Sequence, residues 1–489
     1  MRAILIGGGP VSCLVARQLR KLSIEVDIYE RGPDPRLPRT GRGHSFNLTL
    51  TLRGLSTLDP ELRDVLYGHG VPCPRRVVHH DDGSLTSQPY GTKEHHLLSI
   101  PRHVLHCTLL TEAEEAGARV FFDHEAIKVD TRNARAVFVA KDKGVREAEG
   151  DLLLGVDGAN SIVRHEMTKA GARLEVQQEF IKHGYIELHM PPGGKGEHAL
   201  RTMTSGDDRH ALHLWPRGEF VLIAQPNQDG SYTTTLFMPL DPDENGRPGL
   251  RQLTTSAAVK AFFYKYFPDA VSLLPDLTDD FFAAPPASLK IVRCNPFHYG
   301  RTVLLGDAAH TMVPFYGQGI NCSFEDVATF IELFQRALTR HDPAAAVQQT
   351  LADFTAARKA PGDAIIALSR AHLDELSAQA GQQQYHTQRR IERELHERYP
   401  DHFVPLYQRV AFTTIPYDVS LELYERDQQA LTDLLERFDP ETESGKIHQA
   451  FGERIGGKGR SVAGHTDPGT TAGAGGVTTA TAPGRGGKK

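Results

Sequence analysis

One segment of the sequence combines residue types that suit the binding of a polar, sugar-containing ligand. It reads VLLGDAAHTMVPFYGQGINCSFED and covers residues 303–326. Its apolar start predicts a buried strand ending at Asp307, where a carboxylate can accept hydrogen bonds from ribose or ribitol hydroxyls. The glycines that follow lead into a helix-like pattern, and the unpaired amides of a helix start favour anionic or polar groups. The positions that we expect to contact such a ligand are Asp307, Gly319, Ile320 and Asn321.

A second segment, GGGPVS, lies between a predicted strand and a predicted helix. Glycines in such a turn let the backbone approach a pyrophosphate, which the helix dipole stabilises. Glu30 ends the next predicted strand and could accept hydrogen bonds from both ribose hydroxyls. Ser12 replaces the usual third glycine and is still small enough for close packing. A glycine-rich turn can occur without a ligand, but this setting favours dinucleotide binding, with contacts expected at Gly7, Gly9, Val11 and Glu30.

A third segment, GVDGANSIVR, covers residues 155–164. A predicted buried strand runs there into an Asp-Gly pair and then into a predicted helix. Asp157 could contact the same ligand, or it could simply cap the helix. Each of the three segments could be an ordinary turn by itself. Their order and spacing together indicate a nucleotide cofactor.

The elements around these segments predict a parallel, doubly wound sheet, because a strand–helix–strand unit opens the chain. Predicted strands cover 2–6, 25–30, 117–122, 136–141 and 150–156, and predicted helices cover 10–22 and 103–116. Between about 178 and 290, short strand-like segments separated by turns such as NQDG predict a largely antiparallel second sheet. Beyond about 318 the pattern is helical, over 322–339, 346–359, 362–399 and 418–437.

Composition narrows the class of protein. The 489 residues are 39% hydrophobic and 24% charged with a net charge of −6, which is typical of a soluble globular protein and gives no reason to expect nucleic acid. The five cysteines form no CxxC pair, which favours a reducing cytoplasm. No apolar run approaches the roughly 20 residues of a membrane span. The 24 histidines show no HExxH spacing, so we expect no metal site.

Several longer segments resemble the single-component flavoprotein aromatic hydroxylases, in particular the members that hydroxylate kynurenine. The matching segments cover most of residues 1–415. They are NLTLTLRG (47–54), QPYGTK (88–93), IPRHVLH (100–106), IKHGYIELHMPP (181–192), HLWPRGEFVLIAQPN (213–227), TLFMP (235–239), KYFPDA (265–270), LLGDAAHTMVPFYGQGINCSFED (304–326) and FVPLY (403–407).

This resemblance implies an α/β fold with a Rossmann-like FAD-binding domain of the para-hydroxybenzoate hydroxylase type. It also implies an inserted, mostly antiparallel substrate domain and a C-terminal helical region. We expect a discontinuous FAD-binding domain (1–75, 100–177 and 291–345), a substrate domain (76–99 and 178–290), a helical region (346–455) and a disordered tail (456–489). The resemblance adds Arg102 and Ala126 to the expected FAD contacts.

The resemblance also implies a substrate site. Arg76 and Tyr90 match the pair that holds the substrate's carboxylate, and the chemistry agrees because a guanidinium binds a carboxylate through two hydrogen bonds. Without the resemblance, Arg76 could be a solvated arginine beside Arg75. Tyr407 matches a further substrate-site tyrosine, or it is a core tyrosine with a satisfied hydroxyl. The expected lining of the aromatic pocket is Phe237, Pro314, Phe315 and Tyr316.

Three positions depart from the family pattern. His372 stands where the family has an asparagine that helps to bind the polar end of the substrate, and an imidazole titrates near neutral pH. Ser12 and His44 are smaller departures.

The implied function is hydroxylation of L-kynurenine to 3-hydroxy-L-kynurenine, a step of tryptophan catabolism, by FAD that is reduced by NADPH and reoxidised by O2. No side chain need act as a nucleophile, so we expect substrate-positioning residues and assign no catalytic one. Two alternatives stay open: a substituted kynurenine or another ortho-amino aromatic acid as substrate, and a flavin-binding protein without hydroxylase activity. We expect a monomer or homodimer without a membrane anchor.

Overall fold

The computed structural model describes residues 1–38, 46–141, 144–171, 173–194, 198–200, 210–244, 246–378, 383–400 and 402–456. His44 and the predicted disordered tail beyond Gly456 lie outside these residues.

A six-stranded sheet has the order β18-β19-β12-β1-β2-β8, and its strands pair in parallel except β18 with β19. Residues 3–6 of β1 are buried, as expected for a strand covered on both faces. The predicted parallel sheet is therefore confirmed. The strands are β1 (Arg2–Ile6), β2 (Glu25–Tyr29), β8 (Arg119–Phe121), β12 (Leu152–Gly155), β18 (His298–Tyr299) and β19 (Thr302–Leu304).

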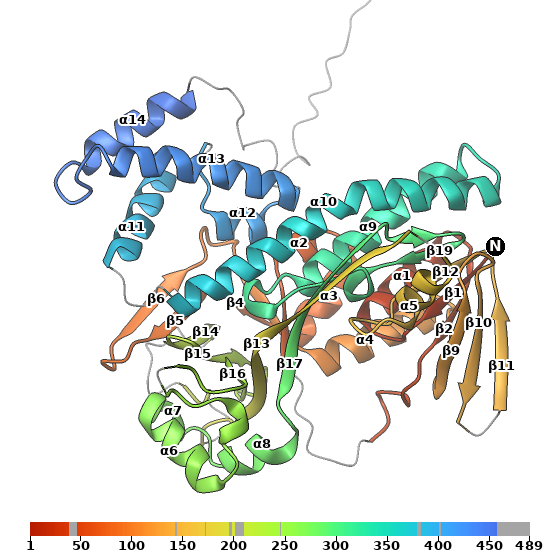
Figure 1. Cartoon of the computed structure of the whole chain (residues 1–489), viewed down its shortest axis with the longest axis horizontal. Helices are drawn as coiled ribbons and strands as arrows, with labels where there is room; N and C mark the ends of the chain where they lie inside the picture. The colour runs from red at the N-terminus through yellow and green to blue at the C-terminus, as the bar shows by residue number, and fades with distance from the viewer. Residues whose placement is uncertain are drawn as a thin grey trace, which may run out of the picture.

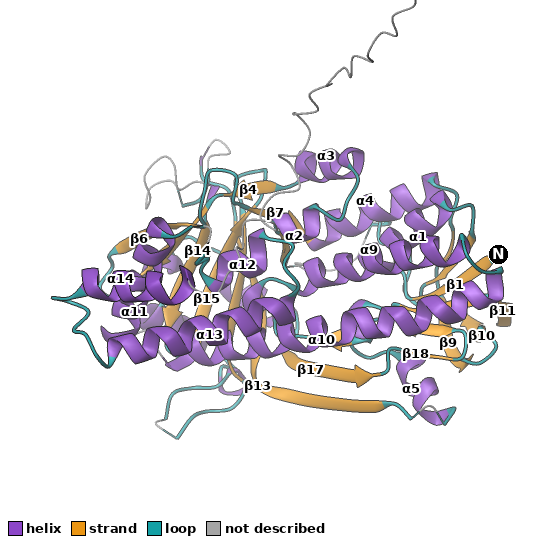
Figure 2. Cartoon of the chain, turned by 90° about the horizontal axis from the view of Figure 1, so that it is seen from above, coloured by secondary structure: helices purple, strands orange, loops and turns teal. Residues whose placement is uncertain are grey.

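Helices cover this sheet. The first, α1, starts at a proline, whose fixed φ and missing amide suit the first helical turn, and it packs against α4 and α9 (Figure 2). A three-stranded antiparallel sheet, β11-β10-β9, lies at the end of the molecule that also holds the N-terminus (Figure 1). The bounds are α1 (Pro10–Lys21), α4 (Arg102–Glu115), α5 (Ile162–Lys169), α9 (Gly319–Leu338), β9 (His124–Asp130), β10 (Arg135–Ala140) and β11 (Gly144–Glu149).

A second large sheet has eight strands in the order β20-β17-β13-β16-β15-β14-β5-β6. Its pairs are antiparallel except β14 with β5, which confirms the expectation of a mostly antiparallel sheet. The long strands β13 and β17 reach from this sheet toward the first (Figure 1). The bounds are β5 (Arg75–His79), β6 (Leu85–Pro89), β13 (Glu175–Met190), β14 (Leu212–Arg217), β15 (Phe220–Pro226), β16 (Tyr232–Pro239), β17 (Ala287–Asn295) and β20 (His310–Thr311).

Smaller elements complete these layers. Helices that the sequence pattern did not predict pack on the second sheet through an apolar cluster that includes Trp215 and Phe263. They are α6 (Ser256–Tyr266), α7 (Pro268–Val271) and α8 (Leu277–Ala283). A small sheet of order β3-β7-β4 and two helices lie in sequence between β2 and β8: β3 (Asn47–Leu50), β4 (Val71–Cys73), β7 (Leu97–Pro101), α2 (Leu52–Leu55) and α3 (Pro60–His69).

The C-terminal part is helical, as expected, but its boundaries differ from the prediction. Separate helices were predicted over 346–359 and 362–399, yet α10 runs unbroken through Pro361. An interior proline loses one backbone hydrogen bond, and the packing of α10 along α9 and α13 outweighs this loss. The predicted helix over 362–399 is divided between α10 and α11. The helices are α10 (Pro343–Ala378), α11 (Gln383–Arg398), α12 (Leu406–Phe412), α13 (Tyr417–Leu435) and α14 (Ser444–Gly456).

In the part of the chain that the structure describes, no helix is both long and apolar enough to cross a bilayer.

Candidate active site

A cavity of about 680 Å³ brings together residues of the eight-stranded sheet, residues that follow β12 and β19 of the six-stranded sheet, and residues of β3, α9, α10 and α12. All eight residues predicted to contact a substrate line it: Arg76, Tyr90, Phe237, Pro314, Phe315, Tyr316, His372 and Tyr407. Of the predicted cofactor contacts, the same wall includes Gly9, Val11, Arg102, Asp307, Gly319 and Ile320.

Asp307 sits in a 3-10 turn directly after β19. The turn is joined to the Asp-Gly segment, because the Leu305 amide donates to the Gly155 carbonyl at 3.1 Å. The Asp307 side chain is exposed to the cavity. It also lies deep within the protein, and this burial raises the pKa of its carboxyl group, while His310 and Arg102 oppose the shift.

The glycine-rich loop before α9 is held by Asn321. The side-chain amide of Asn321 donates to the carbonyls of Thr49 at 2.9 Å and Gly317 at 2.8 Å, and its oxygen accepts from the Thr51 amide at 2.9 Å. Gly317 has φ +64°. A Cβ there would lie 2.7 Å from Thr49 Oγ1, so only glycine fits this turn. Asn321 itself is buried outside the cavity wall, and the loop presents the first amides of α9 to the cavity.

The first glycine-rich turn is braced from outside the cavity. The carboxylate of Glu30 accepts from the amides of Gly8 and Gly32, each at 2.7 Å. Gly7 has φ +98°, and a Cβ there would lie 2.6 Å from the Val156 carbonyl oxygen. Gly7 and Glu30 thus shape the turn, whereas Gly9 and Val11 face the cavity.

Two further expected cofactor residues also lie away from the cavity wall. Asp157 Oδ2 accepts from the amides of Ile162 at 2.7 Å and Val163 at 3.2 Å. Asp157 therefore caps the start of α5, which is the second of the two roles that the sequence left open. Its Oδ1 is buried without a hydrogen-bond partner, and burial raises the pKa of the group. Ala126 lies in β9 and packs against the main apolar core.

Arg76 is one of the charged residues on the cavity wall, with Arg102, Lys290 and Asp307. It lies on β5, and its Nε donates to Gln88 Oε1 on the neighbouring strand β6 at 2.8 Å. Among the described residues no carboxylate pairs with this guanidinium. A cation held at a cavity wall without a counter-ion is suited to an anionic ligand group.

Two tyrosines, the buried Tyr90 and the half-buried Tyr407, face the same space. Tyr90 follows β6, Tyr407 lies in α12, and their rings stack with centroids 5.6 Å apart. Neither phenol oxygen has a hydrogen-bond partner among the residues that the structure describes. Burial raises the pKa of Tyr407 to about 12 and that of Tyr90 as well, and Arg76 opposes both shifts. Both phenols are therefore protonated near neutral pH and are available as donors.

Other rings extend this wall. Tyr316 stacks on Tyr407 with centroids 5.5 Å apart and meets the His372 ring edge-on at 5.0 Å. Phe237 and Phe315 lie 4.9 Å apart. An apolar, aromatic cavity with few polar groups is typical of a site for a flat organic substrate.

Comparison with known proteins agrees with this geometry. A family model described as "FAD binding domain" matches residues 1–369. The chain is 40% identical to kynurenine 3-monooxygenase of Salinispora tropica over 88% of this chain and 92% of that protein. It is 36% identical to kynurenine 3-monooxygenase of Sus scrofa over 88% of each. The chain belongs to the kynurenine 3-monooxygenase family.

Solved structures show the same fold outside the kynurenine 3-monooxygenase family. The tetrameric form of 2-methyl-3-hydroxypyridine-5-carboxylic acid oxygenase has a TM-score of 0.63 at 18% identity, covering 84% of this chain and 96% of that one. PqsL of P. aeruginosa, solved with 2-aminobenzoylacetate, has a TM-score of 0.57 at 16% identity, covering 77% and 97%. At these identities the likeness concerns the fold.

FAD, the cofactor of kynurenine 3-monooxygenases, fits the residues present. The space beside Gly9 is open, because apart from its chain neighbours no atom lies within 4 Å of a Cβ position there, so the backbone is accessible to a pyrophosphate. Asp307 can accept from ribitol hydroxyls, and the first amides of α9 can donate to a further polar group. The chain is thus a flavoprotein monooxygenase of this family with FAD as its cofactor.

The cavity of this kynurenine 3-monooxygenase family member also contains residues that the sequence patterns did not identify. They include Tyr185, Gln225 and Lys290. All three lie on strands of the second sheet, where alternation predicts which residues share a face but not what that face contacts. No local signal distinguishes them from other strand residues.

Proposed function

We propose that the chain hydroxylates L-kynurenine to 3-hydroxy-L-kynurenine and consumes NADPH and O2. The observation that carries this proposal is the grouping of Arg76, Tyr90 and Tyr407 in one cavity with Asp307 and the start of α9. Among the described residues the Arg76 guanidinium has no counter-ion and the two phenols have no hydrogen-bond partner, which suits the carboxylate of an amino acid, and the aromatic wall suits its ring.

The protein's part in the reaction is to bind and orient. When bound, FAD supplies the redox chemistry through which O2 is activated. Arg76 holds the substrate carboxylate by charge-assisted hydrogen bonds, while the Tyr90 and Tyr407 hydroxyls donate to the same polar end. The rings of Tyr316, Phe237 and Phe315 confine the aniline ring and exclude water from it. Electron donation from the aniline nitrogen directs oxygen to the ortho carbon, so the chain needs no nucleophile of its own.

The direct test is one aerobic incubation of the purified, FAD-loaded protein with kynurenine and NADPH. We expect a product heavier by one oxygen atom that co-elutes with 3-hydroxykynurenine, with little hydrogen peroxide. Oxidation of NADPH that yields peroxide and no hydroxylated product would contradict the proposal.

His372 supports a second candidate, the same chemistry on a substituted kynurenine or another ortho-amino aromatic acid. Its imidazole lines the cavity against Tyr316, so it can contact the substrate directly. Relative turnover on a panel of ring-substituted kynurenines, for the natural chain and for His372→Asn, decides between the candidates. A panel on which unsubstituted kynurenine is best for both chains would remove this candidate.

We further propose that the enzyme works in a reducing cytoplasm as a monomer or homodimer. All five cysteines lie among the described residues and none is in a disulfide. Light scattering of the native protein gives its mass and therefore its oligomeric state. A tetramer would contradict the proposed monomer or homodimer.

A further inference from the structure

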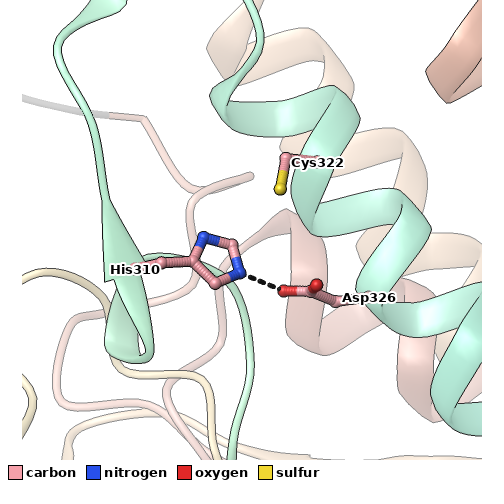
Figure 3. Close-up of side chains that lie close together, drawn as sticks. All are labelled: His310, Cys322 and Asp326. Carbon is pink, nitrogen blue, oxygen red and sulfur yellow. Dashed lines mark hydrogen bonds and ion pairs between the residues drawn. The ribbon is translucent and has the colours of Figure 1, made fainter. Parts of the chain in front are cut away.

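A buried cluster lies directly beneath the loop that carries Asp307. It consists of His310, Cys322 and Asp326, whose possible ligand atoms all lie within 4.8 Å of one another (Figure 3). His310 Nε2 donates to Asp326 Oδ2 at 2.6 Å, and the Gly306 amide donates to the same oxygen at 3.0 Å. Asp326 thereby fixes both ends of the turn containing Asp307.

This cluster does not suit a metal ion. The second oxygen of Asp326 accepts from Arg358 Nε at 2.7 Å, so both carboxylate oxygens are occupied. Arg358 Nη2 lies 3.3 Å from Cys322 Sγ, which would place a guanidinium beside any bound cation. The cluster is part of an ion-pair network instead.

The network continues across α9 and α10. Arg358, on α10, also reaches Glu325 Oε2 at 3.3 Å. Glu325 Oε1 accepts from Arg53 Nη1 at 2.6 Å, and Arg53 lies on α2. The order of partners is therefore Arg53, Glu325, Arg358, Asp326 and His310, which we call the charge chain.

The far end of the charge chain holds the helix that carries Tyr407. Arg53, only 1% exposed, donates through Nε to the Val410 carbonyl at 2.6 Å and through Nη2 to the Ile415 carbonyl at 2.6 Å. Val410 belongs to α12, three residues after Tyr407. Arg53 also lies over the ring of Tyr417 at 4.1 Å, and the Tyr417 hydroxyl donates to Gln318 Oε1 at 3.0 Å in the glycine-rich loop.

We propose that the charge chain is a positioning device that couples the substrate end of the cavity to the flavin end. One end holds α12 and hence Tyr407, and the other holds the turn with Asp307. The inference rests on the proposed function, because that function identifies kynurenine as the ligand at Tyr407. The part of the inference that concerns FAD at Asp307 does not depend on the proposed function. Arg53, Glu325 and His310 are positioning residues, because they line no part of the cavity and act through Tyr407 and Asp307.

The physical reason is the rigidity of buried charge. Every member except Glu325 is less than 9% exposed, and an unpaired charge at such depth is strongly unfavourable. Each ion pair therefore resists displacement of either partner, and a shift at one end must be accommodated along the whole charge chain. Binding of FAD against Asp307 should then order α12, and by reciprocity a ligand at Tyr407 should strengthen FAD binding.

The test interrupts the charge chain at Glu325, its most accessible member, with Glu325→Gln. A matched control is Glu112→Gln, because Glu112 accepts from the buried Arg17 at 2.9 Å on α1 and contacts no member of the charge chain. Hydrogen–deuterium exchange of the peptide covering α12 is measured with and without FAD. We expect FAD to slow exchange there about fivefold or more in the natural chain and in the control, and less than twofold in Glu325→Gln.

Equal protection of α12 by FAD in the natural chain and in Glu325→Gln would overturn the proposal, as would the absence of protection in the natural chain. If Glu325→Gln does not fold, Arg53→Lys keeps the charge but cannot make the same set of bonds to α12, and the same loss is expected. This measurement needs no kynurenine. Failure of kynurenine to bind would therefore count against the proposed function alone.

In a second measurement the FAD dissociation constant is determined with and without kynurenine. We expect kynurenine to lower it about fivefold or more in the natural chain and in Glu112→Gln, but not in Glu325→Gln. A purely structural role for Glu325 would lower the melting temperature and leave this ratio unchanged, which would contradict the coupling.

Discussion

At the scale of single residues, the informative feature is polar groups that have no partner. Tyr90 is buried and Tyr407 is half-buried, yet neither hydroxyl has a hydrogen bond and Arg76 has no counter-ion among the described residues. A buried polar group without a partner costs folding free energy, so such groups are retained where a ligand completes them. The three residues are therefore best explained as one half of a binding site.

Arg76→Ala should weaken kynurenine binding about 10- to 100-fold, because a hydrogen bond to a charged group contributes about 1.5–3 kcal/mol. FAD should stay bound. The dissociation constant is measured by titration of the flavin absorbance. Arg75→Ala is the control, since Arg75 lies on the same strand but not on the cavity wall. Unchanged affinity in Arg76→Ala would remove Arg76 from the site.

Tyr407→Phe should weaken kynurenine binding by about tenfold and leave the melting temperature unchanged, because the lost hydroxyl has no protein partner. Tyr417→Phe should instead lower the melting temperature and leave kynurenine binding unchanged, because the Tyr417 hydroxyl donates to Gln318 within the protein. Calorimetry and ligand titration of both variants make the comparison. A lower melting temperature in Tyr407→Phe would mean that its hydroxyl serves the fold.

At the scale of elements, the turns at strand ends decide where a cofactor can lie. The Asp-Gly turn after β12 and the Gly-Asp turn after β19 end neighbouring parallel strands, so their backbones meet at one edge of the sheet. Two of the three glycines of the first turn, Gly7 and Gly9, have different roles. Gly7 packs on the Val156 carbonyl, whereas Gly9 faces open space.

Gly9→Ala should leave the stability of FAD-free protein unchanged but weaken FAD binding at least tenfold, because the added methyl occupies the space of the cofactor. Gly7→Ala should lower the stability of the FAD-free protein as well, since its φ of +98° and its close contact disfavour any side chain. Urea unfolding and flavin fluorescence separate the two effects. Normal FAD affinity in Gly9→Ala would place the cofactor elsewhere.

At the scale of the whole molecule, the charge chain makes stability depend on pH. Burial opposes the charged form of His310, but Asp326 prevails and raises its pKa above 6.5. Burial alone would raise the pKa of Asp326. The neighbouring His310 and Arg358 outweigh burial and lower this pKa to about 2. The stabilisation from His310 is thus fully present below pH 6.5 and is lost as the pH rises through its raised pKa. That from Asp326 is lost as the pH falls from 3.8 toward 2.

As the pH rises above about 6.5, the free energy of unfolding should therefore decline more steeply in the natural chain than in His310→Gln. The difference between the two proteins isolates His310 from the other histidines. Urea titrations at a series of pH values measure it. Parallel curves would show that His310 does not change its protonation on folding.

Prediction from sequence succeeded where the signal was local. The strand–turn–helix units around Gly9 and Asp307 depend on neighbouring residues, and the parallel sheet follows from their order. Prediction failed at Pro361, because the packing of α10 on α9 and α13 is not visible in the residues near the proline. The sequence patterns also did not distinguish the roles of these carboxylates. Glu30 and Asp157 accept hydrogen bonds from backbone amides, whereas Asp307 faces the cavity.

The sequence by itself thus determined the class of cofactor, since glycine turns and carboxylates at strand ends are short-range features. The resemblance named Arg76, Tyr90 and Tyr407 as a set. Only the tertiary structure decided that these residues share one cavity with Asp307. It also showed that, among the described residues, the two phenols have no hydrogen-bond partner and Arg76 has no counter-ion, and that ion pairs join the two ends. The physical reason is that contacts between residues hundreds of positions apart depend on how the sheets and helices pack, which no local pattern encodes.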